Sequence, residues 1–178
     1  KVMFIGQLDS NIDMAIEGGS FPAWIRDLEQ VVPKKDWYSL IQDKFPSSYV
    51  MMYSYGRRNI SWSTVAPTGT VSIMAGTSSG IEPVFSLEYT RDIQTFDGSE
   101  RVVVKDYGYD RLSVVGKTAD KVSVKEHVDV LITASKYVDS ACSKTCNVGD
   151  SVTWEEFKNV YMQAYEGGAS GCTTFRAA

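Results

Sequence analysis

Short apolar runs alternate with turn residues along the chain, and their spacing predicts its helices and strands. Residues 9–17 place Ile12, Ala15 and Ile16 at helical spacing behind polar residues suited to capping, and Gly18-Gly19 follows as a stop signal. This pattern predicts a helix over 9–17.

The next segment, residues 21–48, is rich in proline and in large aromatic residues. This composition favours short helices joined by turns over one long element. The side chains expected to anchor this packed connection are Trp24, Leu28, Trp37 and Leu40.

The centre of the chain predicts a strand, a turn and a helix in succession. Residues 60–65 alternate apolar and small polar residues, which is typical of a strand, and this run ends before Pro67. The turn at 67–69 leads into a short apolar segment that Gly76 closes. Residues 84–93 and 101–105 are extended candidates around a loop at Asp97-Gly98.

Two capping boxes predict two further helices in the last third of the chain. Ser123 precedes Glu126 by three residues, and Thr153 precedes Glu156 by three; the second helix should stop at Gly167-Gly168. The residues expected on the buried stripes are Val124, Val128, Leu131, Ile132 and Val138 on the first helix and Trp154, Phe157, Val160, Tyr161 and Ala164 on the second.

Residues 141–148 and 171–176 are predicted strands on either side of the second of these helices. Strands that alternate with helices indicate parallel pairing in an α/β layer. A chain of 178 residues is long enough for one sizeable core, so we expect a single domain over residues 1–178.

Composition narrows the classes of partner. The net charge is −4 with a pI near 5.0, and the basic residues are scattered, which argues against nucleic acid as a partner. No apolar run reaches the roughly 18 residues of a membrane span, so we expect no membrane partner and a cytoplasmic protein. The chain begins at Lys1 without a methionine and stops directly after a predicted strand, so we expect it to belong to a longer protein.

The three cysteines are expected to be free thiols, because their number is odd and the chain is large enough to fold without disulfides. On one strand, Cys142 and Cys146 would lie about 13 Å apart, beyond the roughly 7 Å that a disulfide allows. Cys146 and Cys172 occupy strands that could be neighbours, and a packing role is expected for them. With a single histidine and no Cys-x-x-Cys pair, we expect no metal site.

Residues 66–80 are the best candidate for chemistry. A helix that begins after a strand presents unpaired N–H groups, which bind anions, and Gly69 would let a phosphate approach the backbone between the hydroxyls of Thr68 and Thr70. The Gly-Lys-Ser/Thr ending of a P-loop is absent. The same residues also fit a simple Pro-Gly turn with capping threonines, and spacing leaves both interpretations open.

Two titratable residues outside this segment have competing interpretations. His127 lies beside the apolar stripe of its helix, where a packing role is favoured over that of a catalytic base. Glu82 follows the candidate anion segment and could point into the interior of the fold, and a solvated or loop-pinning carboxylate fits this position as well.

The run from Arg57 to Phe85, RRNISWSTVAPTGTVSIMAGTSSGIEPVF, closely resembles the adenosylcobalamin-dependent, class II ribonucleotide reductases. Further segments resemble the same family's C-terminal catalytic region in the same order: Gly18–Pro22, Glu88–Arg91, His127-Val128, Asp139–Val148 and Gly171–Arg176.

The resemblance implies a fold and a site. The fold is part of a ten-stranded α/β barrel of parallel strands alternating with helices, in which ribonucleotides are reduced by radical chemistry. The loop that would hold the phosphates of the ribonucleotide substrate consists of Ala66, Pro67, Thr68, Gly69, Thr70, Val71 and Ser72. The family's catalytic Asn-Pro-Cys-Gly-Glu motif does not occur in this sequence, so no residue is assigned a catalytic role.

We therefore expect the C-terminal part of the catalytic subunit of a ribonucleoside-diphosphate reductase. Adenosylcobalamin is expected in the complete enzyme and not on this chain alone, which should be inactive by itself. Open strand edges should recruit a second copy or a partner chain that completes the barrel. A stand-alone phosphate- or nucleotide-binding module and the structural half of a split reductase are the alternatives.

Overall fold

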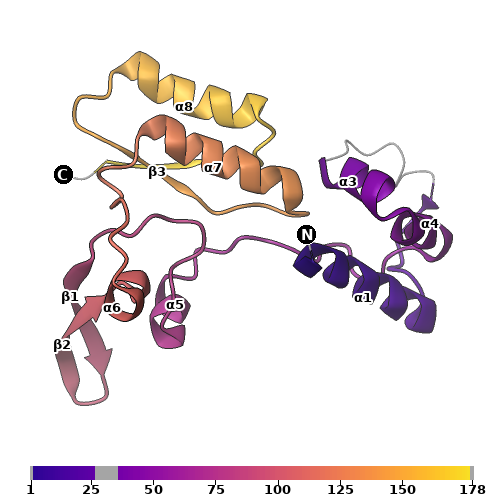
Figure 1. Cartoon of the computed structure of the whole chain (residues 1–178), viewed down its shortest axis with the longest axis horizontal. Helices are drawn as coiled ribbons and strands as arrows, with labels where there is room; N and C mark the ends of the chain where they lie inside the picture. The colour runs from indigo at the N-terminus through magenta and orange to yellow at the C-terminus, as the bar shows by residue number, and fades with distance from the viewer. Residues whose placement is uncertain (1, 27–35, 177–178) are drawn as a thin grey trace. The chain divides into compact units, whose positions relative to one another are not determined.

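The computed structural model describes residues 2–26 and 36–176 and divides the chain into two compact units (Figure 1). The first unit comprises residues 1–64 and 134–141, and the second comprises residues 65–133 and 142–178. The expectation of a single domain over residues 1–178 stays a prediction.

The first unit is helical, with α1 (Val2–Gly18), α3 (Asp36–Lys44) and α4 (Pro46–Tyr55). The helix expected over 9–17 is present, and it begins earlier because Leu8 and other apolar residues of the first turns extend its buried face. It ends as expected, with Gly19 in a positive-φ conformation at 80°. Proline at the first position of α4 starts that helix without losing a backbone hydrogen bond.

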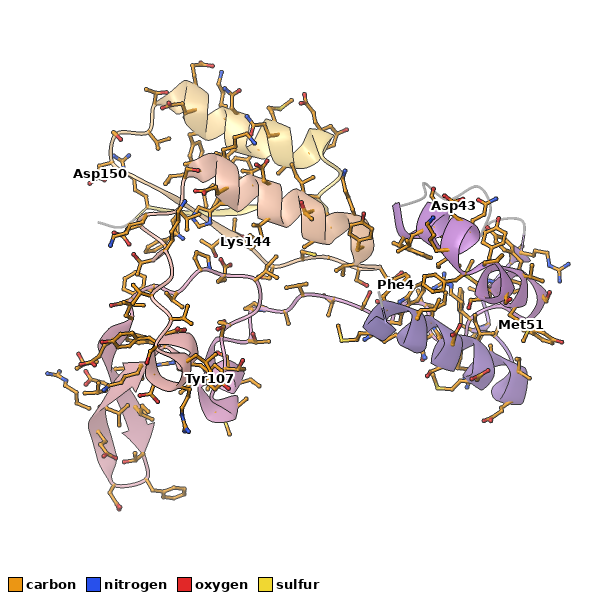
Figure 2. The ribbon with its side chains drawn as sticks, in the orientation of Figure 1. Phe4, Asp43, Met51, Tyr107, Lys144 and Asp150 are labelled. Atoms are coloured by element: carbon orange, nitrogen blue, oxygen red, sulfur yellow. The ribbon has the colours of Figure 1, made fainter. Side chains whose placement is uncertain are left out.

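Apolar side chains from the three helices form the core of this unit. Phe4 of α1, labelled in Figure 2, packs against that core. Of the expected anchors, Trp37 is buried, Trp24 and Leu40 are half-buried, and Leu28 lies outside the described residues. The buried members are Leu8, Ile12, Trp37, Tyr38, Ile41 and Met52.

The prediction of a strand over 60–65 is wrong. The segment is extended, but its only ladder contact among the described residues is a single bridge from Val65 to Cys142. Two backbone N–H groups of the facing segment donate to its carbonyls, that of Ser140 to Ser63 at 3.0 Å and that of Ser143 to Val65 at 2.7 Å. At the next position a side chain intervenes, because the Asp139 carboxylate accepts the N–H of Trp62 at 3.1 Å. Such side-chain bonds compete with a backbone ladder and interrupt it.

The second unit begins with α5 (Gly69–Ala75), the predicted turn-helix, which Gly76 ends with a φ of 62°. It is followed by a hairpin of β1 (Glu88–Thr95) and β2 (Gly98–Lys105). Extended stretches are expected from the sequence over 84–93 and 101–105, and the strands overlap these ranges with shifted ends. They pair antiparallel, which departs from the parallel pairing expected for the α/β layer as a whole. A turn of two residues between strands allows only antiparallel pairing.

Three helices follow the hairpin: α6 (Tyr107–Leu112), α7 (Val124–Tyr137) and α8 (Trp154–Glu166). Both predicted capping boxes are confirmed. The Glu126 carboxylate accepts the N–H of Ser123 at 2.8 Å, and Glu156 accepts that of Thr153 at the same distance.

Two short strands, β3 (Thr145–Val148) and β4 (Thr173–Arg176), pair in parallel across the α8 connection, as predicted. Figure 1 shows α7 and α8 lying over β3, and Val128, Cys146 and Val160 form the core between them. The expected α8 stripe is only partly buried, because Trp154 is 68% exposed and Tyr161 is 40% exposed. A sheet of two strands is too narrow to cover the whole length of a helix.

The described residues therefore form a mixed α/β structure with two two-stranded sheets and no closed barrel. Over the same residues, every helix is too short or too polar to cross a membrane.

Candidate functional site

The candidate phosphate loop turns sharply at Thr68, just before α5. Thr68 adopts a left-handed conformation with φ 52° and ψ 23°, and its carbonyl accepts the N–H of Ser72 at 2.8 Å. Its side chain makes no capping bond to the first turn of α5. The N–H groups of that turn are therefore left without the side-chain acceptor that a threonine cap would supply.

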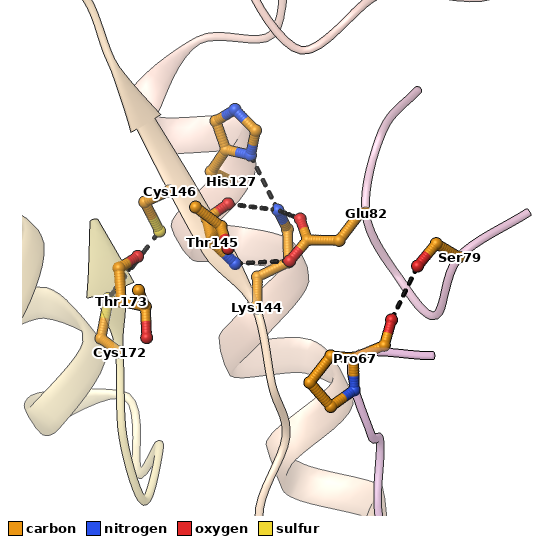
Figure 3. Close-up of polar contacts among 9 residues, drawn as sticks. All are labelled: Pro67, Ser79, Glu82, His127, Lys144, Thr145, Cys146, Cys172 and Thr173. Atoms are coloured by element: carbon orange, nitrogen blue, oxygen red, sulfur yellow. Dashed lines mark hydrogen bonds and ion pairs between the residues drawn. The ribbon is translucent and has the colours of Figure 1, made fainter. Parts of the chain in front are cut away.

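The return from α5 closes the loop onto itself. The Ser79 hydroxyl donates to the Pro67 carbonyl at 2.7 Å, a contact drawn in Figure 3. Gly80 has a φ of 50°, and a Cβ at this position would lie 3.1 Å from the Ala66 carbonyl oxygen. Only glycine combines that conformation with so close an approach. Residues 66–68 and 79–80 thus form one closed turn at the start of α5.

The first turn of α5 faces open space at Gly69. A Cβ built there would meet nothing within 4 Å, and Gly69 is not among the positive-φ residues. Thr70 and Val71 are exposed, whereas Ser72 is buried and its hydroxyl donates to the Gly69 carbonyl at 3.0 Å. Backbone N–H groups and the Thr70 hydroxyl are therefore the accessible donors of this turn.

A cavity of about 480 Å³ adjoins the loop, and Gly69 and Thr70 line one side of it. The hairpin and α6 supply another side, and Tyr107 lies on the side of α6 toward α5 (Figure 2). Arg91 lines the cavity and makes no ion pair within the described part of the chain. The cavity therefore offers backbone donors and the cation of Arg91 to an anionic ligand, and the carboxylates of Glu82, Asp106 and Asp110 line it as well.

Behind the loop lies a buried polar cluster (Figure 3). The Lys144 ammonium donates to Glu82 Oε2 at 2.6 Å, to the Thr145 carbonyl at 2.6 Å and to His127 Nδ1 at 2.9 Å. The second carboxylate oxygen, Glu82 Oε1, accepts the N–H of Thr145 at 2.5 Å. The side chain of Lys144 is 1% exposed and that of Glu82 is 25% exposed.

These contacts determine the state of His127. Lys144 has three N–H donors, so His127 Nδ1 must accept and the imidazole is neutral. Burial, followed by the nearby Lys144 charge, lowers the pKa of His127 below its usual range. His127 is only 1% exposed, which supports the packing interpretation. Glu82 binds the backbone of Thr145, as a loop-pinning carboxylate would, and it also lines the cavity.

The three cysteines are free, as expected from the sequence. The Sγ atoms of Cys146 and Cys172 lie 3.8 Å apart, which confirms that their strands are neighbours. The hydrogen bond between them lowers the pKa of Cys172 to about 7, and together with burial it raises the pKa of Cys146. The described residues hold no cluster of three or more metal-ligating side chains.

Sequence reasoning missed Lys144, although the strand pattern carries a signal for it. Residues 142, 144, 146 and 148 share one face, and all four are buried. The other three are Cys142, Cys146 and Val148, so the alternation places a lysine on an apolar face. A buried cation needs a charged partner, and Glu82 is that partner.

Comparison with known proteins decides the family. The family described as "Ribonucleotide reductase, barrel domain" matches residues 1–175. This chain belongs to that family. The resemblance carried by residues 57–85 is thereby confirmed.

Curated relatives agree with the class II resemblance. The chain is 30% identical over 147 residues to a vitamin B12-dependent ribonucleoside-diphosphate reductase of Mycobacterium tuberculosis, covering 67% of this chain and 21% of the relative. It is 30% identical over 148 residues to the protein of that name from Thermoplasma acidophilum, covering 67% and 19%. A vitamin B12-dependent ribonucleotide reductase of Streptomyces clavuligerus is 23% identical over 156 residues, covering 68% and 16%. The chain thus spans about a fifth of the length of the first two relatives.

Proposed function

We propose that this chain is the C-terminal part of the catalytic barrel of an adenosylcobalamin-dependent ribonucleotide reductase, in which residues 66–72 hold the phosphates of the ribonucleotide substrate. The observation that carries the proposal is the open first turn of α5 at Gly69, within the run that resembles the family's phosphate loop.

Each part of the loop has a distinct task in this proposal. Thr68 turns the backbone, and the N–H groups that follow it, with the Thr70 hydroxyl, donate to phosphate oxygens. Each charge-assisted hydrogen bond contributes about 1.5–3 kcal/mol to the free energy of binding, before the entropic cost of ordering the loop and the ligand is subtracted. Ala66 and Pro67 shape the closed turn, Val71 adds a backbone donor, and the Ser72 hydroxyl holds the first turn of the helix. Arg91 supplies positive charge across the cavity.

The names of the relatives imply vitamin B12, whose cobalt a histidine can ligate. The one histidine of this chain, His127, is buried with Nδ1 on Lys144, so it does not fit as a ligand for cobalt. We place adenosylcobalamin elsewhere in the complete enzyme and derive no step from it. The chain alone should not reduce ribonucleotides, and turnover with adenosylcobalamin and a dithiol would contradict this.

The proposal extends to assembly. β3 and β4 form a parallel pair whose outer edges are unpaired among the described residues. Such edges pair with further strands. A second copy of this chain or a partner chain would complete the barrel, and light scattering at micromolar concentrations should detect the association. A monodisperse monomer would contradict self-association.

Phosphate titration followed by amide NMR shifts tests the site. Shifts at residues 68–72 should change up to roughly 30 mM phosphate, a range that detects millimolar affinity. Gly69→Val should remove these changes, because a branched side chain fills the open space that the anion needs. Gly6→Val is the control, since Gly6 also lies in a helix with nothing within 4 Å. Unchanged wild-type shifts at 68–72 would remove the assignment.

A further inference from the structure

A buried lysine connects β3 to the candidate phosphate loop. Lys144 directly precedes β3 and contacts Glu82, which is 62 residues earlier in the chain (Figure 3). Glu82 also accepts the backbone N–H of Thr145, the first residue of β3. Two bonds from one carboxylate therefore hold the segment around Glu82 against the strand.

The segment that Glu82 anchors is the one that closes the loop. The N–H of Glu82 donates to the Ser79 carbonyl at 3.1 Å, and the Ser79 hydroxyl donates to the Pro67 carbonyl at 2.7 Å. Gly80, between them, lies against the Ala66 carbonyl. A continuous series of contacts thus runs from Lys144 through residues 79–82 to the turn at 66–68.

We propose that Lys144 is the positioning residue of the phosphate loop: with Glu82 it fixes residues 79–82 to the start of β3 and thereby holds residues 66–68 in the conformation that opens the first turn of α5. The inference rests on the proposed function of that loop. Lys144 does not contact the phosphate itself.

Charge gives Lys144 a second effect on the same site. Glu82 lines the cavity that Gly69 and Thr70 also line, and a bare carboxylate there would repel an anion. The ammonium of Lys144, 2.6 Å away, compensates that charge. Removing the lysine alone therefore both frees the loop and leaves an anion beside the phosphate position.

A purely structural role makes a different prediction. A buried ion pair can often be replaced by apolar residues of similar volume without loss of stability, whereas removal of one partner is destabilising. If the pair only stabilised the fold, replacing both charged residues would restore stability and phosphate binding together. If it positions the loop, stability should return without phosphate binding.

The experiment compares Lys144→Met with the double variant Lys144→Met/Glu82→Met in the full chain, with inorganic phosphate as the probe. Lys144→Met should lower the unfolding temperature and weaken phosphate binding by about tenfold or more. The double variant should regain most of the unfolding temperature but remain about tenfold weaker for phosphate. The control is Lys125→Met/Asp129→Met, an exposed ion pair on α7, which should change neither property.

Amide hydrogen exchange without phosphate separates this inference from the proposed function. In both Lys144 variants, exchange at residues 79–82 and 68–72 should be faster than in the wild type, because the anchor is lost. Glu82→Gln is a milder third variant, because it keeps the size of the side chain and the oxygen that accepts the N–H of Thr145. It should also speed amide exchange at residues 79–82 and 68–72, but by less. If the wild type fails to bind phosphate, the phosphate assignment falls and exchange still decides the positioning role. If the folded double variant exchanges its amide hydrogens at the wild-type rate and binds phosphate with the wild-type affinity, the inference is overturned.

Discussion

Two glycines of the candidate loop should respond in opposite directions to alanine. Gly69 begins α5 and a Cβ there meets nothing within 4 Å. Gly80 has a φ of 50°, and a Cβ there would lie 3.1 Å from the carbonyl oxygen of Ala66. We therefore expect Gly69→Ala to stabilise the chain and Gly80→Ala to destabilise it.

The magnitudes follow from these local geometries. At Gly69, alanine restricts the unfolded chain and suits a helix, which contributes about 0.5–1 kcal/mol. At Gly80, the left-handed conformation costs an alanine about 1–2 kcal/mol. The close contact between the new Cβ and the Ala66 carbonyl oxygen adds to this cost, because a backbone atom cannot move aside as the end of a flexible side chain can. The free energies of unfolding of the two variants should differ by about 2–3 kcal/mol.

Gly76→Ala separates the two contributions at Gly80. Gly76 also has a positive φ, of 62°, but a Cβ there meets nothing within 4 Å. Its substitution should therefore show only the conformational cost, about 1–2 kcal/mol. The additional loss in Gly80→Ala measures the approach to Ala66.

Urea unfolding followed by circular dichroism measures these differences. The expected order of stability is Gly69→Ala, wild type, Gly76→Ala and Gly80→Ala, from highest to lowest. For a chain of this size, 1 kcal/mol corresponds to roughly 2–4 °C in the unfolding temperature, so the extremes are readily resolved. Equal stability of Gly80→Ala and Gly76→Ala would refute the closure of the loop onto Ala66.

Three further predictions concern the rest of the chain. Titration of thiols under denaturing, non-reducing conditions should count Cys142, Cys146 and Cys172 as three free thiols, and a count of one would reveal a disulfide. Thr153→Ala should lower the free energy of unfolding by about 1 kcal/mol through loss of the α8 cap, whereas Thr153→Ser should retain most of it. Because burial lowers the pKa of His127 in the folded state, the stability that its neutral form contributes is complete above about pH 6.5 and is lost as the pH falls toward the folded-state pKa. The urea concentration at the midpoint of unfolding should therefore decrease as the pH is lowered from about 8 to 5.5, and His127→Leu should make this dependence on pH weaker.

Local sequence signals predicted the elements whose causes are local. The capping boxes at 123–126 and 153–156 are within one helical turn, so the residues that form them are always near one another. The hairpin loop at Asp97-Gly98 and the helix stop at Gly76 depend on turn residues at the position itself. These elements could be predicted because no distant residue decides them.

Other predictions depended on neighbours that the pattern does not reveal. Residues 60–65 alternate like a strand, but Asp139 binds the backbone N–H of Trp62 in place of a ladder partner. The apolar stripe of α8 includes Trp154, yet the two-stranded sheet beneath the helix leaves it exposed. Alternation and helical spacing identify a face, whereas the size and identity of what covers that face come from elsewhere in the chain.

By itself the sequence determined the turn at 67–69, the short helix after it and the family to which the run 57–85 belongs, because each is a property of contiguous residues. Only the tertiary structure decided that Lys144 meets Glu82 and His127. These partners lie 62 and 17 residues from Lys144, and their ionic hydrogen bonds require a buried site that exists only when the strand and the loop are brought together. The anchoring of the loop is therefore a consequence of chain placement, which no local pattern encodes.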